Sequence, residues 1–181
     1  LSYNPQYIWL PTEISSAYSK CSVIFSIFDY SLIKFENNNK PKVHNDLALL
    51  LSTSGSTGSP KYVKISYDNI KSNALSIVKY LNIDRNERPI TTLPMSYSFG
   101  LSIINSHFQV GATLLLTNFS MFEKEFWFFL KNEKATSLSG VPYTFEMLKK
   151  LRFMRMSLPH LKTLTQAGGK MNIDLNKEFA E

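Results

Sequence analysis

The chain has 181 residues, 44% of them hydrophobic and 19% charged, which is typical of a globular domain that buries its own core. Its 20 basic and 14 acidic residues give a net charge of +6, but the basic residues are scattered along the chain. Nucleic-acid-binding proteins usually concentrate them in one patch, so nucleic-acid binding is disfavoured. The densest group follows an expected helix and indicates a solvated surface: Lys149, Lys150, Arg152 and Arg155.

The residues suited to disulfides, metals and nucleophilic catalysis are few. Cys21 is the single cysteine and lies in an apolar run, which excludes a disulfide framework within the chain and favours a reducing, cytoplasmic location. His44, His107 and His160 are widely separated and have no metal-ligand spacing. No protein-bound metal and no catalytic triad are therefore predicted, and no apolar stretch is long enough to span a membrane.

In chain order, Ser22–Phe28 and Leu32–Phe35 are the first expected strands. We interpret residues 1–44 as peripheral strands and a connecting segment of the same fold as residues 45–181. Beyond residue 45, the expected strands are Leu47–Ser52, Tyr62–Ser66, Pro89–Leu93, Ala112–Thr117, Ala135–Ser139 and Lys162–Gln166. The expected helices are one capped by Asp68 or Asn69, one over Phe99–Val110, one opened by a capping box at Ser120–Glu123, one from Tyr143 to Phe153 and one capped by Asn172.

Strand and helix signals that alternate in this way are typical of an α/β fold. They predict a mostly parallel sheet with helices on both faces. Ligands bind such sheets beyond the carboxyl ends of the strands. The turns that leave those ends are therefore expected to converge on one cleft.

The segment Thr53–Lys61 is the most informative part of the chain. It reads TSGSTGSPK and joins two expected strands. Glycines allow the backbone to approach an anion closely, while hydroxyls, backbone N–H groups and a lysine donate to phosphate oxygens. A Ser/Gly-rich linker is the alternative, disfavoured because the run is short and flanked directly by strands. The segment is neither a Walker loop nor a dinucleotide-binding fingerprint.

This segment resembles the signature loop of the adenylate-forming superfamily, which includes acyl-CoA synthetases, luciferases and the adenylation domains of peptide synthetases. Three later segments resemble the same family in the same order. Leu93–Leu101 is similar to the aromatic segment that lines the acyl pocket, Gly111–Leu116 to the strand after it, and Ala167–Gly169 to the turn against the adenine. The resemblance spans about residues 45 to 181.

The resemblance implies roles for particular residues. The expected phosphate donors are Thr53, Ser54, Ser56, Thr57 and Lys61, with Gly55 and Gly58 allowing close approach. Gly168 and Gly169 would lie against the adenine, and Tyr97, Phe99 and Gly100 would face the substrate. Tyr97 and Phe99 read equally well as ordinary core aromatics. Amino-acid-activating relatives carry an aspartate at the position of Tyr97, so an α-amino acid substrate is disfavoured.

The implied reaction joins a carboxylic acid to ATP, with its Mg²⁺, and releases pyrophosphate. The acyl group then passes to the thiol of coenzyme A or of a carrier protein's phosphopantetheine. The chain begins at Leu1 and ends at Glu181 without the family's Tyr-Gly-x-Thr-Glu segment, ribose-binding aspartate or C-terminal domain. We therefore expect a piece of a larger ligase with little turnover of its own. The alternatives are a nucleotide-binding module without adenylation activity and an interaction domain with a degenerate site.

Overall fold

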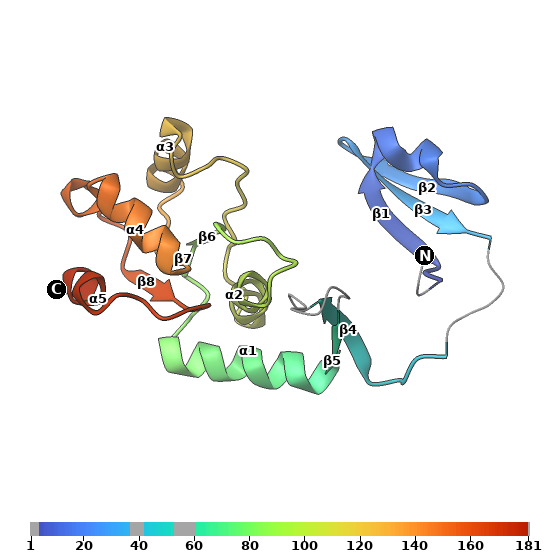
Figure 1. The fold of residues 1–181 in the computed structure, drawn as a ribbon, viewed down its shortest axis with the longest axis horizontal. Helices are drawn as coiled ribbons and strands as arrows, with labels where there is room; N and C mark the ends of the chain where they lie inside the picture. Colours follow the sequence, from blue (N-terminus) through green and yellow to red (C-terminus); the bar gives the residue numbers. More distant parts are fainter. Residues whose placement is uncertain (1–3, 37–41, 53–60, 181) are drawn as a thin grey trace. The chain divides into compact units, whose positions relative to one another are not determined.

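The computed structural model describes residues 4–36, 42–52 and 61–180. The chain divides into two compact units, residues 1–45 and residues 46–181 (Figure 1). That residues 1–44 form a peripheral part of the same fold stays a prediction.

The first unit is a three-stranded antiparallel sheet with the strand order β1-β3-β2. It comprises β1 (Tyr7–Pro11), the 3-10 helix η1 (Thr12–Ala17), β2 (Cys21–Ile27) and β3 (Tyr30–Phe35). The Thr12 and Ser31 hydroxyls lie 2.9 Å apart, tying η1 to β3, and Leu10 and Ile33 are buried. Both strands predicted in this region are present, with their ends shifted by one or two residues.

The second unit opens with an antiparallel hairpin of β4 (Leu47–Ser52) and β5 (Tyr62–Ser66). The prediction of a mostly parallel sheet is therefore only partly confirmed. Strands joined by a short loop pair antiparallel, because a parallel partner needs a crossover of a dozen or more residues. The segment between Ser52 and Tyr62 is too short for that crossover.

Helix α1 (Tyr67–Leu81) follows β5 directly. Its N-cap is Ser66, whose hydroxyl accepts from the Asn69 amide at 3.1 Å, while the Asn69 side chain accepts from the Ser66 amide at 3.1 Å. The prediction of Asp68 or Asn69 as the cap was wrong by two or three residues. Asn69 is the third helical residue of a capping box, in which it and the cap satisfy each other's N–H groups.

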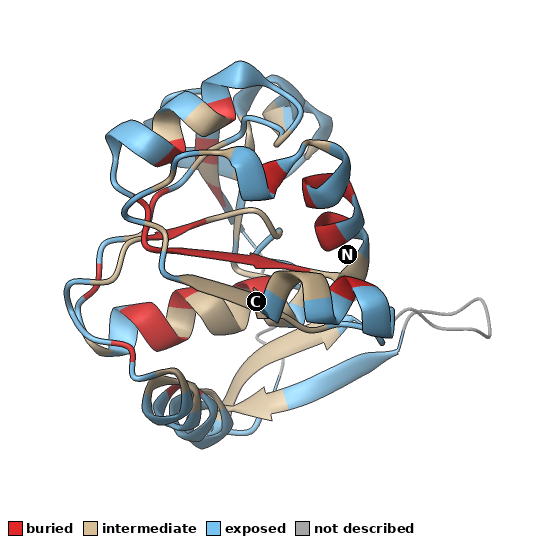
Figure 2. Ribbon diagram, turned by 90° about the vertical axis from the view of Figure 1, so that its left-hand side faces the viewer, coloured by how far each residue is buried: buried red, intermediate tan, exposed pale blue. Residues whose placement is uncertain are grey.

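A three-stranded parallel sheet forms the centre of the second unit, with β7 (Ser137–Gly140) between β6 (Pro89–Ile90) and β8 (Thr163–Gln166). All four residues of β7 are buried, as expected for a strand covered on both faces. In Figure 2 this is the strand coloured red along its length.

The strand predicted over Ala112–Thr117 is reduced to one parallel bridge between Ile90 and Leu115, which corrects that prediction. Backbone bonds flank this bridge, because the Leu115 amide donates to the Pro89 carbonyl and the Thr91 amide donates to the Leu115 carbonyl, both at 2.9 Å. Beyond them, the Thr91 hydroxyl replaces the backbone ladder. It donates to the Leu115 carbonyl at 3.2 Å and accepts from the Thr117 amide at 3.3 Å. Side-chain bonds of this kind compete with the backbone ladder.

The remaining helices are α2 (Ser98–Gln109), α3 (Lys124–Asn132), α4 (Pro142–Lys150), the 3-10 helix η2 (Phe153–Arg155) and α5 (Ile173–Ala180). Asn172 accepts from the Asp174 amide at 2.8 Å, as expected of the cap of α5. Helix α3 begins at Lys124, and the predicted capping box is only half formed. The Glu123 carboxylate accepts from the Ser120 amide, but the Ser120 hydroxyl accepts from the Phe122 amide at 3.4 Å instead of from that of Glu123. The core packs Ile90 and Leu138 of the sheet against Phe126, Leu130, Phe145, Leu148 and Leu175 of these helices.

Candidate functional site

The three parallel strands end at one edge of the sheet, and hydrogen bonds between consecutive segments tie that edge together. The Thr92 hydroxyl donates to the Ser139 carbonyl, and the Ser139 and Thr165 hydroxyls lie 2.7 Å apart. The Ala167 amide donates to the Gly140 carbonyl at 3.4 Å. This carboxyl edge is where ligands bind in α/β sheets, and its side-chain bonds fix how its three segments lie.

Two of the predicted site residues meet at this edge. Gly168 follows β8 with φ of +83°, and a Cβ on it would collide with the Tyr97 hydroxyl and lie 3.1 Å from Val141 Cγ1. The Gln166 side-chain amide donates to the Gly169 carbonyl at 2.8 Å, which braces the turn. The structure thus brings the segment before α2 against the turn after β8.

Gly100 serves the local packing of the same segment. The Tyr97 amide donates to the Pro94 carbonyl at 3.1 Å, and the Leu101 amide donates to the Tyr97 carbonyl at 3.0 Å. Gly100 is buried, and a Cβ there would collide with the Pro94 carbonyl oxygen. The missing side chain lets Pro94 fold back onto the first turn of α2, which positions Tyr97. Phe99 is half-buried, so its exposure favours neither the substrate-facing role nor the core role that the sequence allowed.

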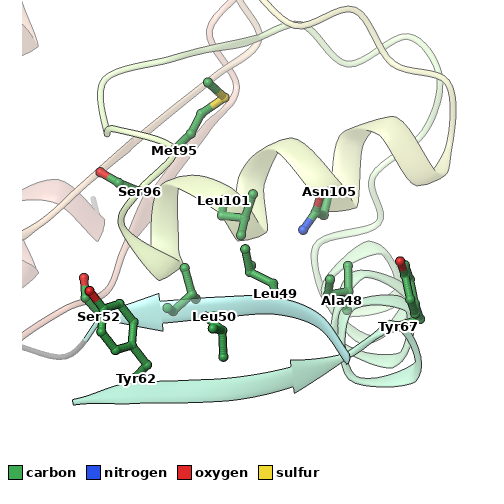
Figure 3. A pocket seen from close by; sticks show the side chains of 12 residues that line it. Ala48, Leu49, Leu50, Ser52, Tyr62, Tyr67, Met95, Ser96, Leu101 and Asn105 are labelled. Atoms are coloured by element: carbon green, nitrogen blue, oxygen red, sulfur yellow. The ribbon is translucent and has the colours of Figure 1, made fainter. Parts of the chain in front are cut away.

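A cleft of about 450 Å³, which we call the hairpin cleft, lies between the β4–β5 hairpin and α2. Figure 3 shows Leu49 of β4 opposite Leu101 of α2, with Ser52 and Tyr62 together at one end. Met95 and Ser96, from the segment that carries Tyr97, also line it. The hairpin cleft therefore adjoins the strand ends that flank the predicted phosphate loop, and it also adjoins the segment predicted to face the substrate.

The phosphate loop itself falls largely outside the described residues. This applies to Thr53, Ser54, Gly55, Ser56, Thr57 and Gly58, so their predicted role stays a prediction. Lys61 is described and lies on the surface, immediately before β5.

Several residues that line the hairpin cleft were not among the predicted site residues, and Asn105 and Tyr67 are two of them. Asn105 stands one helical turn after Leu101 on α2, so the two share a face. A polar residue on that face was the available signal. Tyr67 is the first residue of α1 and is 65% exposed, so no burial pattern in the sequence marks it.

His107, the buried histidine of α2, has a role in packing. Burial lowers the pKa of His107, and the hydrogen bond to the Ile103 carbonyl and the negative charge of Glu87 oppose that effect. The 2.7 Å contact with the Ile103 carbonyl requires Nδ1 to carry the hydrogen, because a carbonyl only accepts. His107 is thus a neutral packing residue.

Within the described part of the chain, no three His, Cys, Asp or Glu side chains are placed to hold a metal ion. Across residues 4–36, 42–52 and 61–180, no helix has the length and apolar character needed to cross a bilayer.

The fold and the carboxyl edge of the parallel sheet define an α/β domain with a candidate ligand site beyond its parallel strands. Residues 9–181 match the model of the AMP-binding enzyme family, and the chain belongs to this family.

Two curated relatives illustrate the match. The chain is 24% identical over 151 residues to feruloyl-CoA synthase of Amycolatopsis sp, covering 76% of this chain and 28% of that protein. It is 29% identical over 104 residues to 2-succinylbenzoate–CoA ligase of Staphylococcus aureus (strain JH9), covering 58% of this chain and 21% of that protein. The chain thus spans about a quarter of the length of these relatives.

Solved structures share the fold. The N-terminal domain of FACL13 from Mycobacterium tuberculosis matches with a TM-score of 0.67 at 23% identity, over 78% of this chain and 36% of that chain. The O-succinylbenzoate coenzyme A synthetase (MenE) from Bacillus subtilis, in complex with AMP, matches with a TM-score of 0.63 at 26% identity. That match covers 72% of this chain and 27% of that chain.

Proposed function

We propose that this protein activates a carboxylic acid with ATP, releases pyrophosphate and passes the acyl group to a thiol, either of coenzyme A or of a carrier protein. The observation that carries the proposal is the contact between Tyr97 and Gly168. It joins the segment expected to face the acid to the turn expected to face the adenine, in a chain of the AMP-binding enzyme family.

The nucleotide end of the proposed site lies at the end of the hairpin where Ser52 pairs with Tyr62. Thr53, Ser54, Ser56, Thr57 and Lys61 would donate to the phosphates of ATP, which brings its own Mg²⁺. Gly168 and Gly169 would lie against the adenine. The hairpin cleft supports this proposal, because Ser52 and Tyr62, at the two strand ends, line it together with Ser96. The binary complex of MenE with AMP fits an adenine nucleotide as the ligand.

The chemistry assigned to these residues is electrostatic. The acid's carboxylate attacks the α-phosphorus, a phosphorus–oxygen bond to pyrophosphate breaks, and negative charge builds up on the leaving group. Fixed donors around the β- and γ-phosphates stabilise that charge without forming a bond to the protein. No residue is assigned as a general acid or base.

At the acid end, Tyr97 is the proposed contact. Its phenol can donate one hydrogen bond but cannot form an ion pair with an ammonium group, so a substrate without an α-amino group is favoured. The named products of both curated relatives are coenzyme A thioesters of ring-bearing acids, which supports coenzyme A as the acceptor. A carrier protein is the other acceptor under this proposal.

The test is carboxylate-dependent exchange of pyrophosphate into ATP, run on this chain and on the full-length protein with a panel of acids. We expect exchange from the full-length protein and little from the 181 residues alone. Lys61→Ala should lower it by about 10- to 100-fold, because a charge-assisted hydrogen bond contributes about 1.5–3 kcal/mol. Lys71→Ala, which removes an exposed lysine of α1, is the matched control.

Exchange that survives Lys61→Ala would contradict the assigned role of this lysine. ATP binding without exchange for any acid would replace the proposal with a nucleotide-binding module.

A further inference from the structure

A second cleft of about 200 Å³ opens at the carboxyl edge of the parallel sheet, on segments that the proposed chemistry leaves unused. We name it the Phe122 cleft. Its walls are Thr92 after β6, the connection Phe119–Phe122 before α3, Phe126 of α3, and Tyr143, Thr144 and Met147 of α4. Most of these segments follow the carboxyl ends of parallel strands, where α/β sheets bind ligands.

The Phe122 cleft has an exposed mouth and a buried floor. Phe119, Phe122 and Tyr143 are 46%, 60% and 62% exposed, whereas Phe126 and Met147 are 1% and 5% exposed. Three large apolar side chains are therefore held in water around a packed base. Such an arrangement favours an apolar group that covers the mouth and rests on the floor.

The lining also defines the chemistry of the occupant. It contains no Asp, Glu, Lys, Arg or His, so a charged group would lose its hydration without gaining a partner. A cavity of about 150 Å³ takes up benzene, so this volume accommodates one aryl ring. Aromatic and thioether side chains around a ring provide favourable edge and sulfur contacts.

The Phe122 cleft is close to the contact between Tyr97 and Gly168. Val141, which borders that contact, is the N-cap of α4, and Tyr143 and Thr144 of the cleft follow it within one helical turn. One turn is about 5.4 Å along a helix axis. Thr92 in the wall also belongs to the segment that leads to Tyr97. The Phe122 cleft and the Tyr97–Gly168 contact therefore lie on shared segments of the same sheet edge.

We propose that the Phe122 cleft binds the uncharged ring of the carboxylic acid substrate, and so selects acids with an aryl tail. This rests on the proposed function for the identity of the ligand, but ring binding itself needs neither ATP nor turnover. The proposal assigns specificity for the acid substrate to Phe122, Tyr143 and Met147, none of which is expected to contact ATP.

The methionines of the chain allow a direct test. Met121 and Met147 line the Phe122 cleft, and Met95 lines the hairpin cleft. The chain would be labelled with ¹³C at its methionine methyl groups, assigned by Met→Leu substitutions and titrated with 3-phenylpropionate. Propionate, which lacks the ring, is the control ligand. We expect saturable ring-current shifts at Met121 and Met147, with a Kd on the order of millimolar for so small a ligand.

Two exposed phenylalanines provide matched variants. Phe122→Ala should weaken 3-phenylpropionate binding by about threefold to tenfold, the usual value of one aromatic contact. Phe128→Ala removes a side chain of α3 that is 70% exposed and does not line the cleft, and should leave the Kd unchanged. Both positions are exposed, so neither change removes core packing.

Shifts at Met95 instead of Met147, the absence of a saturable shift, or equal affinities of the two variants would overturn the proposal. Pyrophosphate exchange with aryl acids alongside any of these results would leave the proposed function standing and remove only the ring site. Ring binding at Met147 without pyrophosphate exchange by the full-length protein would leave the ring site standing and remove the proposed function.

Discussion

Gly168 tolerates no side chain, for two separate reasons. Its φ of +83° lies in the region that side chains rarely adopt, and its missing Cβ leaves the space that the Tyr97 hydroxyl occupies. The first reason is the backbone conformation, whereas the second is mainly one oxygen atom, with Val141 Cγ1 at 3.1 Å as a lesser contact. The two can therefore be separated by substitution.

We expect Gly168→Ala to lower the free energy of unfolding by about 2–4 kcal/mol, the sum of left-handed strain and overpacking. In the background of Tyr97→Phe, which removes the hydroxyl, the same change should cost less, about 1–2 kcal/mol, because the collision with the hydroxyl is gone while the strain and the close approach to Val141 remain. Urea unfolding of the four proteins in this double-mutant cycle measures the difference. Equal costs in both backgrounds would show that Tyr97 does not press on this turn.

At the scale of single residues, one contact was predictable from the sequence and another was not. The Gly-Gly turn and the Tyr97 segment were expected to converge because both follow parallel strands, and the structure brings Tyr97 and Gly168 into contact. The packing role of Gly100 was not foreseeable. It depends on Pro94 folding back over α2, and no pattern in the residues encodes that close approach.

At the scale of elements, α1 and its apolar face were predictable from their spacing, but the start of the helix was not. Ser66, Asp68 and Asn69 are all good capping residues, and β5 runs directly into the helix. The choice among them depends on where the strand stops pairing. Leu47 pairs with Ser66, so the ladder ends there and the helix begins at Tyr67.

Ser66→Ala should lower the free energy of unfolding by about 0.5–2 kcal/mol, because the amide of Asn69 loses its acceptor. Ser72→Ala is the control, since Ser72 is exposed within the same helix and alanine there is a better helix former. Thermal unfolding of both variants makes the comparison. A Ser66→Ala protein as stable as the Ser72→Ala protein would contradict the capping assignment.

The strand predicted over Ala112–Thr117 failed for a reason that lies outside its own residues. The run is apolar and reads as a buried strand, yet Leu116 is 67% exposed. Its neighbour β6 begins at Pro89, which has no N–H group to donate, so the parallel ladder is interrupted there. A strand needs the donors of its partner, and these cannot be read from the strand itself.

At the scale of the whole molecule, the α/β class was predictable because strands and helices alternate over the second unit. The sequence was divided between residues 44 and 45, and that residues 1–44 belong to the same fold stays a prediction. The central cluster of buried residues lies between Ile90 and Phe179, within one unit. Residues 46–181 therefore contain their principal core.

We expect residues 46–181 to fold without the first unit. The truncated chain should keep a cooperative thermal transition and a near-ultraviolet circular dichroism signal from Trp127, whose ring packs at 5.1 Å from that of Phe126. Loss of that signal, with helical content retained, would show that this core requires residues 1–45. The midpoint of the thermal transition measured on the full chain is the reference.

The row formed by Thr92, Ser139 and Thr165 has a consequence for ligand affinity. Thr92 follows β6, and Ser139 and Thr165 lie in the paired strands β7 and β8. Their hydroxyl groups add bonds between these segments at the carboxyl edge, so their relative positions are fixed once the chain has folded. A molecule that arrives at this edge meets a frame already in place. Its binding is not weakened by the entropy of ordering these segments, and its selectivity is set by the fixed spacing between them.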